Sequence, residues 1–428
     1  MTIGNRILLY GATGYMGQLL ALRAAQLKLP VVLAARDATK LAELAESVNL
    51  PYLAFALESP KDRAERLKRQ PPARPSSRGK AKKDAAKPFA NPNRGVDKAL
   101  ANVGVVLNAA GPFAETAEPL ARACMRTKTH YVDISGEYDV FRALRTLYDE
   151  AGQPDIAVVP GAGLTPLGSG LLLQQALTAG TAQGMGEPHT VRVALSRVPA
   201  VSRGSAKTML ESVRNGVRIH QNGSPMALPV GSLVRSFHFG SDQAFRTDDA
   251  RICTAITLAD AVTVNATVTD ALNSGSNVRV AVPNVETYVE ATSLEQFAYE
   301  LGSEFSLPLR TFPLKCSLDY ALSFWPEGPT EDDRRDYHQQ VVVEVEDRYR
   351  RGVSARLLTP NSQDFTVAAA LTAANLLLTD RRGETGFLAP SQIVTQQAFD
   401  KYLPAKACHT ITTTHGSRSS VTSSQSFP

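Results

Sequence analysis

Three glycines near the start of the chain have the spacing to bind a dinucleotide. Gly11, Gly14 and Gly17 follow an apolar stretch, residues 6–10, and precede residues 18–22, whose composition is typical of a helix. Glycines in a strand-to-helix turn let the backbone approach a pyrophosphate, and the helix N-terminus adds unpaired N–H groups and a partial positive charge. The spacing G-x-x-G-x-x-G at this place predicts a phosphate-binding turn. The alternative is a glycine-rich turn that binds nothing.

The end of the second predicted strand indicates which nicotinamide nucleotide binds. This strand, residues 31–36, comes about 20 residues after the glycines and ends in Arg36. An Asp or Glu at this place accepts a hydrogen bond from the ribose 2′-hydroxyl of NAD, whereas a guanidinium clamps the 2′-phosphate of NADP. Arg36, with Lys40 one helical turn later, therefore predicts NADP(H). The alternative gives the ribose contact to Asp37 and leaves Arg36 as an ordinary surface arginine.

Two loops farther along the chain are expected beside the cofactor. Residues 108–113 follow the predicted strand 103–108, and residues 133–138 follow the predicted strand 130–134. Parallel strands place such loops at one edge of the sheet, so we expect both at its switch point. The first loop has small residues that let the ribose and the nicotinamide approach the backbone, namely Ala109, Ala110, Gly111 and Pro112.

The second of these loops supplies candidates for proton transfer. Tyr138 and Tyr131 carry hydroxyl groups that can donate a proton to a substrate, and Asp133 can orient a tyrosine or a water molecule. We therefore take Asp133 and Tyr138 as the candidate catalytic residues. The alternative is structural, because Tyr131 and Asp133 lie on or at the end of a buried strand and Tyr138 begins a helix.

Predicted strands and helices alternate over the first part of the chain. This alternation predicts a doubly wound parallel sheet, a Rossmann domain over residues 1–165. The chain has 428 residues, of which 43% are hydrophobic and 20% charged. These values are typical of a globular α/β protein, and the length suggests two or three domains.

From residue 189 onward, apolar and polar residues alternate, which predicts a mainly antiparallel or mixed sheet with one covered face. We expect strands within 189–195, 254–269, 277–282 and 340–345, and a helix over 206–215. The second domain, 166–360, is thus α+β and is expected to serve substrate binding and dimerisation. Helices follow over 361–405, and the Ser/Thr-rich tail 406–428 is predicted to be disordered.

A basic insertion interrupts the first domain over residues 60–95. Between Glu58 and Arg94 there are twelve Lys or Arg and four Asp or Glu, although the net charge of the whole chain is only +5. The Pro, Ser, Lys and Arg content predicts disorder. Such a segment can attract RNA, an anionic membrane or an acidic partner. The alternative is a tolerated insertion without a partner, and we expect no nucleic acid to bind.

Composition also argues against several other classes. No CxxC pair and no metal-ligand spacing occurs among the four cysteines, so we expect reduced thiols and no metal at Cys124, Cys253, Cys316 and Cys408. No apolar run reaches the roughly 18–20 residues that span a bilayer. No charged-then-apolar leader precedes the first strand. We expect a cytoplasmic protein without a transmembrane segment.

Three of these motifs together resemble the saccharopine dehydrogenase-like oxidoreductases, namely residues 10–17, 108–113 and 130–137. Within the family, the trans-acting enoyl reductase branch is the most similar, on residues 202–209, 214–216 and 325–330. The resemblance implies an NADP-binding Rossmann domain, a mixed-sheet domain and a C-terminal segment that packs back on the first domain. It also assigns cofactor contacts to residues 109–112, to Arg36 and to Gly11, Thr13, Gly14, Tyr15, Met16 and Gly17.

The resemblance further implies an activity and a partner. Members of this branch reduce the α,β-double bond of an acyl chain held by a polyketide synthase. We therefore expect an NADPH-dependent reductase, dimeric through its second sheet, that acts on a carrier-bound or lipid-like enoyl chain. One alternative is a saccharopine-type C–N oxidoreductase, which would gather the arginines of the second domain, Arg192, Arg197, Arg203, Arg214 and Arg218. The other is a non-catalytic NADP(H)-binding scaffold or sensor.

Overall fold

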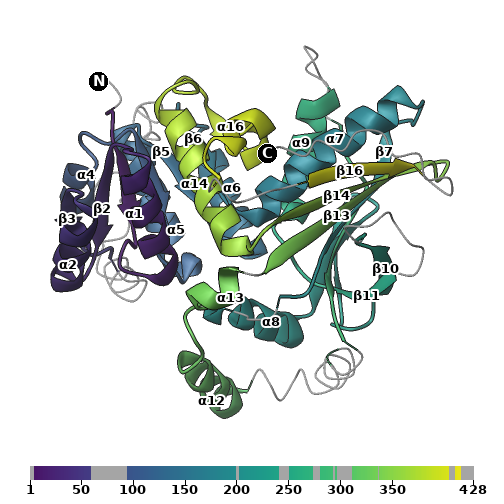
Figure 1. Cartoon of the computed structure of the whole chain (residues 1–428), viewed down its shortest axis with the longest axis horizontal. Helices are drawn as coiled ribbons and strands as arrows, with labels where there is room; N and C mark the ends of the chain where they lie inside the picture. The colour runs from purple at the N-terminus through teal and green to yellow at the C-terminus, as the bar shows by residue number, and fades with distance from the viewer. Residues whose placement is uncertain are drawn as a thin grey trace, which may run out of the picture. The chain divides into compact units, whose positions relative to one another are not determined.

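A computed structural model describes residues 4–58, 94–198, 202–240, 250–272, 280–292, 295, 311–335, 337–403 and 410–415 (Figure 1). The chain divides into two compact units. The first unit consists of Met1–Ser135, Asp139–Pro160 and Ala373–Phe387, and the second of Gly136–Tyr138, Gly161–Thr372 and Leu388–Pro428. The chain therefore returns to the first unit twice, for Asp139–Pro160 and for Ala373–Phe387.

The first unit is built on a seven-stranded sheet in which every neighbouring pair of strands is parallel. The strands lie in the order β15 (Gly386–Phe387), β6 (Ala157–Val159), β5 (His130–Asp133), β4 (Val105–Asn108), β1 (Ile7–Tyr10), β2 (Val31–Ala35) and β3 (Tyr52–Ala54). Strands β1, β4, β5 and β6 are buried along their whole length, as expected for strands covered on both faces. This confirms the predicted doubly wound sheet.

In the part of the chain that the structure describes, these strands are connected by helices α1 (Tyr15–Gln26), α2 (Ala38–Val48), α4 (Arg94–Ala99), α5 (Phe113–Thr127) and α6 (Tyr138–Glu150). Helix α5 is amphipathic, and its buried face, which includes Leu120 and Cys124, joins one core with Leu8 and Val106 of the sheet. The segment Ala373–Phe387 contacts strand β5 through His130. The Nε2 atom of His130 lies 3.1 Å from the carbonyl oxygen of Arg382, and its Nδ1 atom accepts the N–H of Ala157 at 2.9 Å.

The second unit is built on a nine-stranded mixed sheet. Its main path runs β10 (Val234–His238), β11 (Ala250–Ala255), β12 (Asn284–Glu290), β7 (Pro188–Leu195), β13 (His338–Asp347), β14 (Gly352–Pro360) and β16 (Thr410–His415). Strand β8 (Val217–Gln221) pairs with β12 and with β9 (Ser224–Leu228). Strands β7 and β12 are parallel, whereas the other pairs are antiparallel. The predicted mainly antiparallel or mixed sheet is confirmed.

Helices α7 (Ser169–Ala182) and α9 (Asp260–Leu272) pack together, and both contact this sheet. A separate apolar cluster, which includes Phe237, Tyr288 and Val217, joins strands β8, β10 and β12. Among its described residues, the second unit also contains the π-helix Leu164–Gly168, α8 (Arg203–Asn215), α12 (Phe312–Ser323), α13 (Glu331–Arg335), α15 (Pro390–Ile393) and α16 (Gln396–Asp400). Helix α14 (Ser362–Leu378) spans the boundary between the two sets of residues.

Of the strands expected within 254–269 and 277–282, the described residues form strand only at Thr254 and Ala255, the end of β11. Much of the segment 254–269 forms helix α9, because its buried side chains recur at helical spacing, at Asp260, Ala261, Thr263, Val264, Thr267 and Val268. The expected strand 277–282 is not found where the structure describes it, at 280–282. Pro283, which has no N–H to donate, comes directly before strand β12, and the pairing begins at Asn284.

The tail is partly ordered, contrary to the expectation for 406–428. Residues Thr410–His415 form β16 and pair antiparallel with β14. The β-branched Thr and Ile residues of this stretch favour a strand. The rest of the tail lies outside the described residues, and so does the basic insertion 60–95 apart from Arg94 and Gly95, which begin α4.

Candidate functional site

The register of the first sheet brings the predicted site loops to one edge. Tyr10, the last residue of β1, is paired with Ala34 on one side and with Asn108 on the other. Asn108 is in turn paired with Asp133. The loops after β1, β2, β4 and β5 therefore leave the sheet side by side at its carboxyl edge, where doubly wound sheets bind ligands.

Two glycines allow the loop after β1 to pack closely against the loop after β4 and against helix α1. Gly11 has φ +86°, and a Cβ atom there would lie 2.6 Å from the Cα atom of Ala110. At Gly17, a Cβ atom would lie 2.1 Å from the carbonyl oxygen of Gly11. The N–H of Ala109 donates to the carbonyl oxygen of Tyr10 at 2.8 Å. The glycine turn and the loop Ala109–Pro112 are thus in direct contact.

The first turn of helix α1 has the features of an anion site. Gly14 is the N-cap residue and provides no side-chain cap, and no acidic residue occurs in the first turn, which begins Tyr15, Met16 and Gly17. The turn is held by a bond from the Gly14 N–H to the Gly11 carbonyl oxygen (3.0 Å), and Gln18 Nε2 donates to the carbonyl oxygen of Thr13 (3.0 Å). Such a helix start favours a negative charge. It fits the diphosphate of a nicotinamide dinucleotide.

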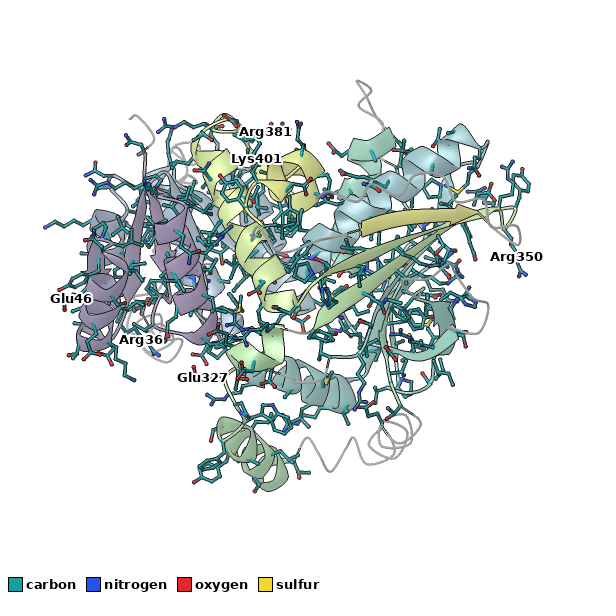
Figure 2. All side chains as sticks on the ribbon, viewed as in Figure 1. Arg36, Glu46, Glu327, Arg350, Arg381 and Lys401 are labelled. Atoms are coloured by element: carbon teal, nitrogen blue, oxygen red, sulfur yellow. The ribbon has the colours of Figure 1, made fainter. Side chains whose placement is uncertain are left out.

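Arg36 is exposed just beyond strand β2 (Figure 2). Lys40, four residues later, is also exposed. Asp37, between them, is the N-cap of helix α2, and its Oδ1 atom accepts the N–H groups of Thr39 at 3.1 Å and Lys40 at 3.2 Å. The Asp37 carboxylate is therefore engaged by the helix start. The arrangement leaves Arg36 as the charged side chain at the strand end that fits a 2′-phosphate.

A buried hydrogen-bond network holds the second cofactor loop. The N–H of Ala110 donates to Asn108 Oδ1 at 3.0 Å, and the carbonyl oxygen of Ala110 accepts from Thr116 Oγ1 at 2.6 Å. Asn108 Nδ2 donates to Thr116 Oγ1 and to the hydroxyl oxygen of Tyr131, both at 3.2 Å. Both polar groups of Ala110 are thus fixed by side chains of β4 and α5.

The candidate Asp133 is the far end of this network. Its Oδ2 atom accepts the Tyr131 hydroxyl at 2.8 Å, and its Oδ1 atom accepts the N–H and Oγ–H of Ser135 at 2.9 and 2.7 Å. Both Asp133 and Tyr131 are fully buried. Burial, and then the nearby Asp133 carboxylate, raise the pKa of Tyr131 well above its usual range. In this geometry Asp133 orients Tyr131.

The candidate Tyr138 belongs to the second unit, where it meets two residues that the sequence did not single out as a pair. Its hydroxyl oxygen lies 3.4 Å from Nε2 of His220, and the Cζ atom of Arg218 lies 5.4 Å from the centre of its ring. His220 and Arg218 come from strand β8. No motif surrounds them, so sequence reasoning had no signal that could have found this cluster.

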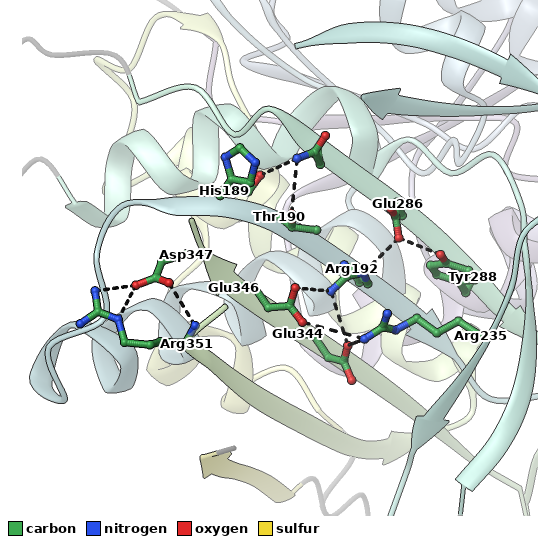
Figure 3. Close-up of polar contacts among 11 residues, drawn as sticks. His189, Thr190, Arg192, Arg235, Glu286, Tyr288, Glu344, Glu346, Asp347 and Arg351 are labelled. Carbon is green, nitrogen blue, oxygen red and sulfur yellow. Dashed lines mark hydrogen bonds and ion pairs between the residues drawn. The ribbon is translucent and has the colours of Figure 1, made fainter. Parts of the chain in front are cut away.

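Two of the other arginines expected for an amino-acid substrate are already paired with glutamates. Arg192 is bonded to Glu286 at 3.0 Å and to Glu346 at 2.9 Å (Figure 3). Arg197 pairs with Glu295 at 3.2 Å. Arg214 is buried in α8.

The motif around Arg203 has a structural contact. Its N–H donates to the carbonyl oxygen of Pro326 at 3.0 Å, and its Nε donates to that of Trp325 at 2.8 Å. The stretches 202–209 and 325–330 therefore meet at the start of α8, and this contact explains part of the motif without a ligand.

The described residues lack the features of two other classes of protein. No group of three or more His, Cys, Asp or Glu in the described part of the chain has the arrangement to hold a metal ion. No helix among the same residues is both long and apolar enough to cross a bilayer.

Comparison with known proteins agrees with this geometry. Residues 7–159 match the family described as the saccharopine dehydrogenase NADP binding domain. Apo saccharopine dehydrogenase (L-Glu forming) from Saccharomyces cerevisiae aligns over 93% of this chain and 96% of that chain, at 14% identity and a TM-score of 0.51. A probable dehydrogenase from Thermotoga maritima aligns over 93% of this chain and 96% of that chain, at 10% identity and a TM-score of 0.38. No curated protein matches.

Proposed function

Because residues 7–159 belong to the family of saccharopine dehydrogenase NADP-binding domains, we propose that the chain is an NADPH-dependent reductase of an enoyl substrate. The double bond lies between the α- and β-carbons of an acyl chain, carried as a thioester or in a lipid-like molecule. The nicotinamide-binding domain and the oxidoreductase-type fold are common to several reactions. The choice among them depends on the second unit.

The observation that favours the acyl substrate is that two arginines of the second unit are already paired with glutamates. An amino acid with several carboxylates needs several guanidinium groups that converge on one place and remain available to it. Here Arg192 is already paired with three glutamates, Glu286, Glu344 and Glu346 (Figure 3). Arg197 is paired with a fourth, Glu295. Each of these pairs is formed within the second unit. This arrangement supports a substrate with little negative charge of its own.

The residues of the first unit account for cofactor binding. The glycine turn and the start of α1 hold the diphosphate, and Arg36 with Lys40 hold the 2′-phosphate. When bound, NADPH supplies a hydride. The loop Ala109–Pro112, fixed through Asn108 and Thr116, limits the positions open to the nicotinamide and so orients the group that reacts.

The proposal is tested by following NADPH oxidation with a panel of enoyl thioesters on carrier protein and on a small thiol. Saccharopine-type substrates, an amino acid with a keto acid, serve as the matched panel. We expect turnover with enoyl thioesters and a product saturated at the α- and β-carbons by mass spectrometry. Turnover confined to the amino-acid panel would assign C–N chemistry instead. Binding of NADPH without turnover of either panel would favour a sensor or scaffold.

A further inference from the structure

Helix α12 of the second unit presents an aromatic patch to solvent, formed by Tyr320, Phe324 and Trp325. Tyr320 and Phe324 are 69% and 71% exposed, and their rings meet edge to face with centroids 5.0 Å apart. They are four residues apart and so lie on one face of the helix, which Phe324 caps. Trp325 follows at once and is 44% exposed. Apolar side chains exposed singly are normal, whereas a contiguous group of them marks an interaction site.

The helix surface around the aromatic patch is uncharged where its side chains are described. Cys316 and Ser317, one turn before Tyr320, are exposed, and so is Ala321, one turn before Phe324. The solvent-facing side of a helix in a globular protein normally carries charged and polar residues. A face made of aromatic and small uncharged side chains suits an apolar partner.

Two basic residues of the neighbouring helix lie on one side of the patch. Helices α8 and α12 are in contact (Figure 1). Arg203 Nε donates to the carbonyl oxygen of Trp325 at 2.8 Å, and Nη1 of the same guanidinium lies 3.9 Å from Glu327. Lys207, one turn after Arg203 on α8, is exposed. Two cations and one anion thus border the patch here, which leaves an excess of positive charge.

The size of the aromatic patch argues against a second copy of the chain as its partner. A buried aromatic side chain covers about 150–250 Å², so the exposed fractions of these three correspond to roughly 300–450 Å². A stable interface between proteins buries about 800 Å² on each partner. A bilayer surface has no such threshold, because Tyr and Trp are favoured one by one at the headgroup level. Basic residues beside them add attraction to anionic lipids.

We propose that the aromatic patch docks the second unit on the surface of an anionic phospholipid bilayer. Tyr320, Phe324 and Trp325 enter the headgroup region, and Lys207 faces the lipid phosphates. The contact is peripheral, and its electrostatic part weakens as salt is added. This inference goes beyond the proposed function and does not depend on it.

The experiment uses the emission of Trp325, which reports on the patch itself because it is the single tryptophan of the chain. The full chain is titrated with vesicles of phosphatidylcholine and with vesicles of equal parts phosphatidylcholine and phosphatidylserine. We expect the chain to sediment with the mixed vesicles and its emission to shift to shorter wavelength, with weaker binding to phosphatidylcholine alone. Phe324→Ser should lower the affinity by about tenfold or more, because a buried phenyl ring is lost. Lys207→Gln should lower it about fivefold, for the mixed vesicles only.

Tyr349 offers a matched control in the same unit. It is 80% exposed in the turn between β13 and β14, and its ring contacts only the guanidinium of Arg351 among the described ring contacts, at 5.4 Å. Tyr349→Ser removes an exposed aromatic ring that is not on α12, so it should bind vesicles like the wild type. If Phe324→Ser folds poorly, Tyr320→Ser takes its place, with the same expected loss.

The outcomes decide what covers the patch. A chain that neither sediments with the mixed vesicles nor changes its emission overturns the proposal. Sedimentation without a change in emission places the lipid contact elsewhere on the chain and also overturns it. So does a dimer that forms without lipid and is abolished by Phe324→Ser in light scattering, because the patch would then belong to a second copy. None of these readouts measures NADPH oxidation, so the proposed function is tested separately.

Discussion

At the scale of single residues, two glycines of the same turn are required for different reasons. A Cβ atom at Gly17 would lie 2.1 Å from the Gly11 carbonyl oxygen, whereas one at Gly14 would lie 3.4 Å from that oxygen, an ordinary contact. We expect Gly17→Ala to lower the melting temperature of the free protein. Gly14→Ala should leave it nearly unchanged but weaken NADPH binding by about tenfold, because the added methyl group occupies space that the diphosphate needs. Calorimetry with and without NADPH measures both effects, and equal melting temperatures for the two variants would contradict the packing argument.

We propose that Arg36 decides between the two nicotinamide nucleotides. Replacing it with Glu places a negative charge where the 2′-phosphate of NADPH is expected, and lets the carboxylate accept from the 2′-hydroxyl of NADH. We expect Arg36→Glu to weaken NADPH binding by about 100-fold or more, on the order of 3 kcal/mol, and to affect NADH binding far less. Arg6→Glu is the control, because Arg6 is also exposed but precedes β1 at the opposite edge of the sheet. Equal loss of both nucleotides in Arg36→Glu would defeat the proposed phosphate contact.

At the scale of elements, strands β4 and β5 and helix α5 share one hydrogen-bond network. Tyr131→Phe removes the hydroxyl that accepts from Asn108 Nδ2 and donates to Asp133 Oδ2, so two buried hydrogen bonds are lost. Each buried hydrogen bond contributes about 0.5–1.5 kcal/mol to stability. We therefore expect a lower free energy of unfolding, and also weaker NADPH binding because the Ala110 loop loses part of its support. Tyr148→Phe, which lies outside the network, should leave NADPH affinity unchanged in the same titration.

The elements of the first unit and their order could be predicted because local patterns determine them. Apolar runs, glycines and alternating helices imply a parallel sheet, and a parallel sheet puts every strand-to-helix loop at one edge. That geometry brings Gly11 and Ala110 into contact although they are 99 residues apart in the sequence. The short strands β3 and β15 were not predicted, because two or three residues carry too weak a pattern.

The contacts within the candidate site could be predicted only in part. Asp133 was expected to orient a tyrosine, but its bond to Tyr131 depends on how two side chains of one strand turn. His220 is 82 residues from Tyr138, and only the folded second unit brings them together. Helix α9 was mistaken for strand because its Val and Thr residues favour strands locally, whereas packing on α7 selects the helix.

At the scale of the whole molecule, each unit contains a buried titratable group, and the two groups respond to pH in opposite directions. In the first unit, burial lowers the pKa of His130. Its contribution to stability is present above the ordinary histidine pKa, about 6.5, and is lost as the pH falls below that value. In the second unit, burial raises the pKa of Asp260 to about 6. The contribution of Asp260 to stability is present in full below pH 3.8, its ordinary pKa, and is lost as the pH rises from there through about 6.

Asp260→Asn should therefore stabilise the second unit at pH 8. The folded pKa of about 6, against 3.8 for the unfolded chain, corresponds to about 3 kcal/mol at 1.36 kcal/mol per unit, and the gain should shrink to about half at pH 5. Ser169, whose hydroxyl donates to the carboxyl, keeps an acceptor in the variant.

Unfolding of the second unit can be followed by fluorescence of Trp325, the single tryptophan of the chain. Asp155→Asn, at an exposed site of the first unit, should shift this transition at neither pH. If Asp260→Asn does not stabilise the Trp325 transition at pH 8, the buried Asp260 carboxylate does not lower the stability of the second unit.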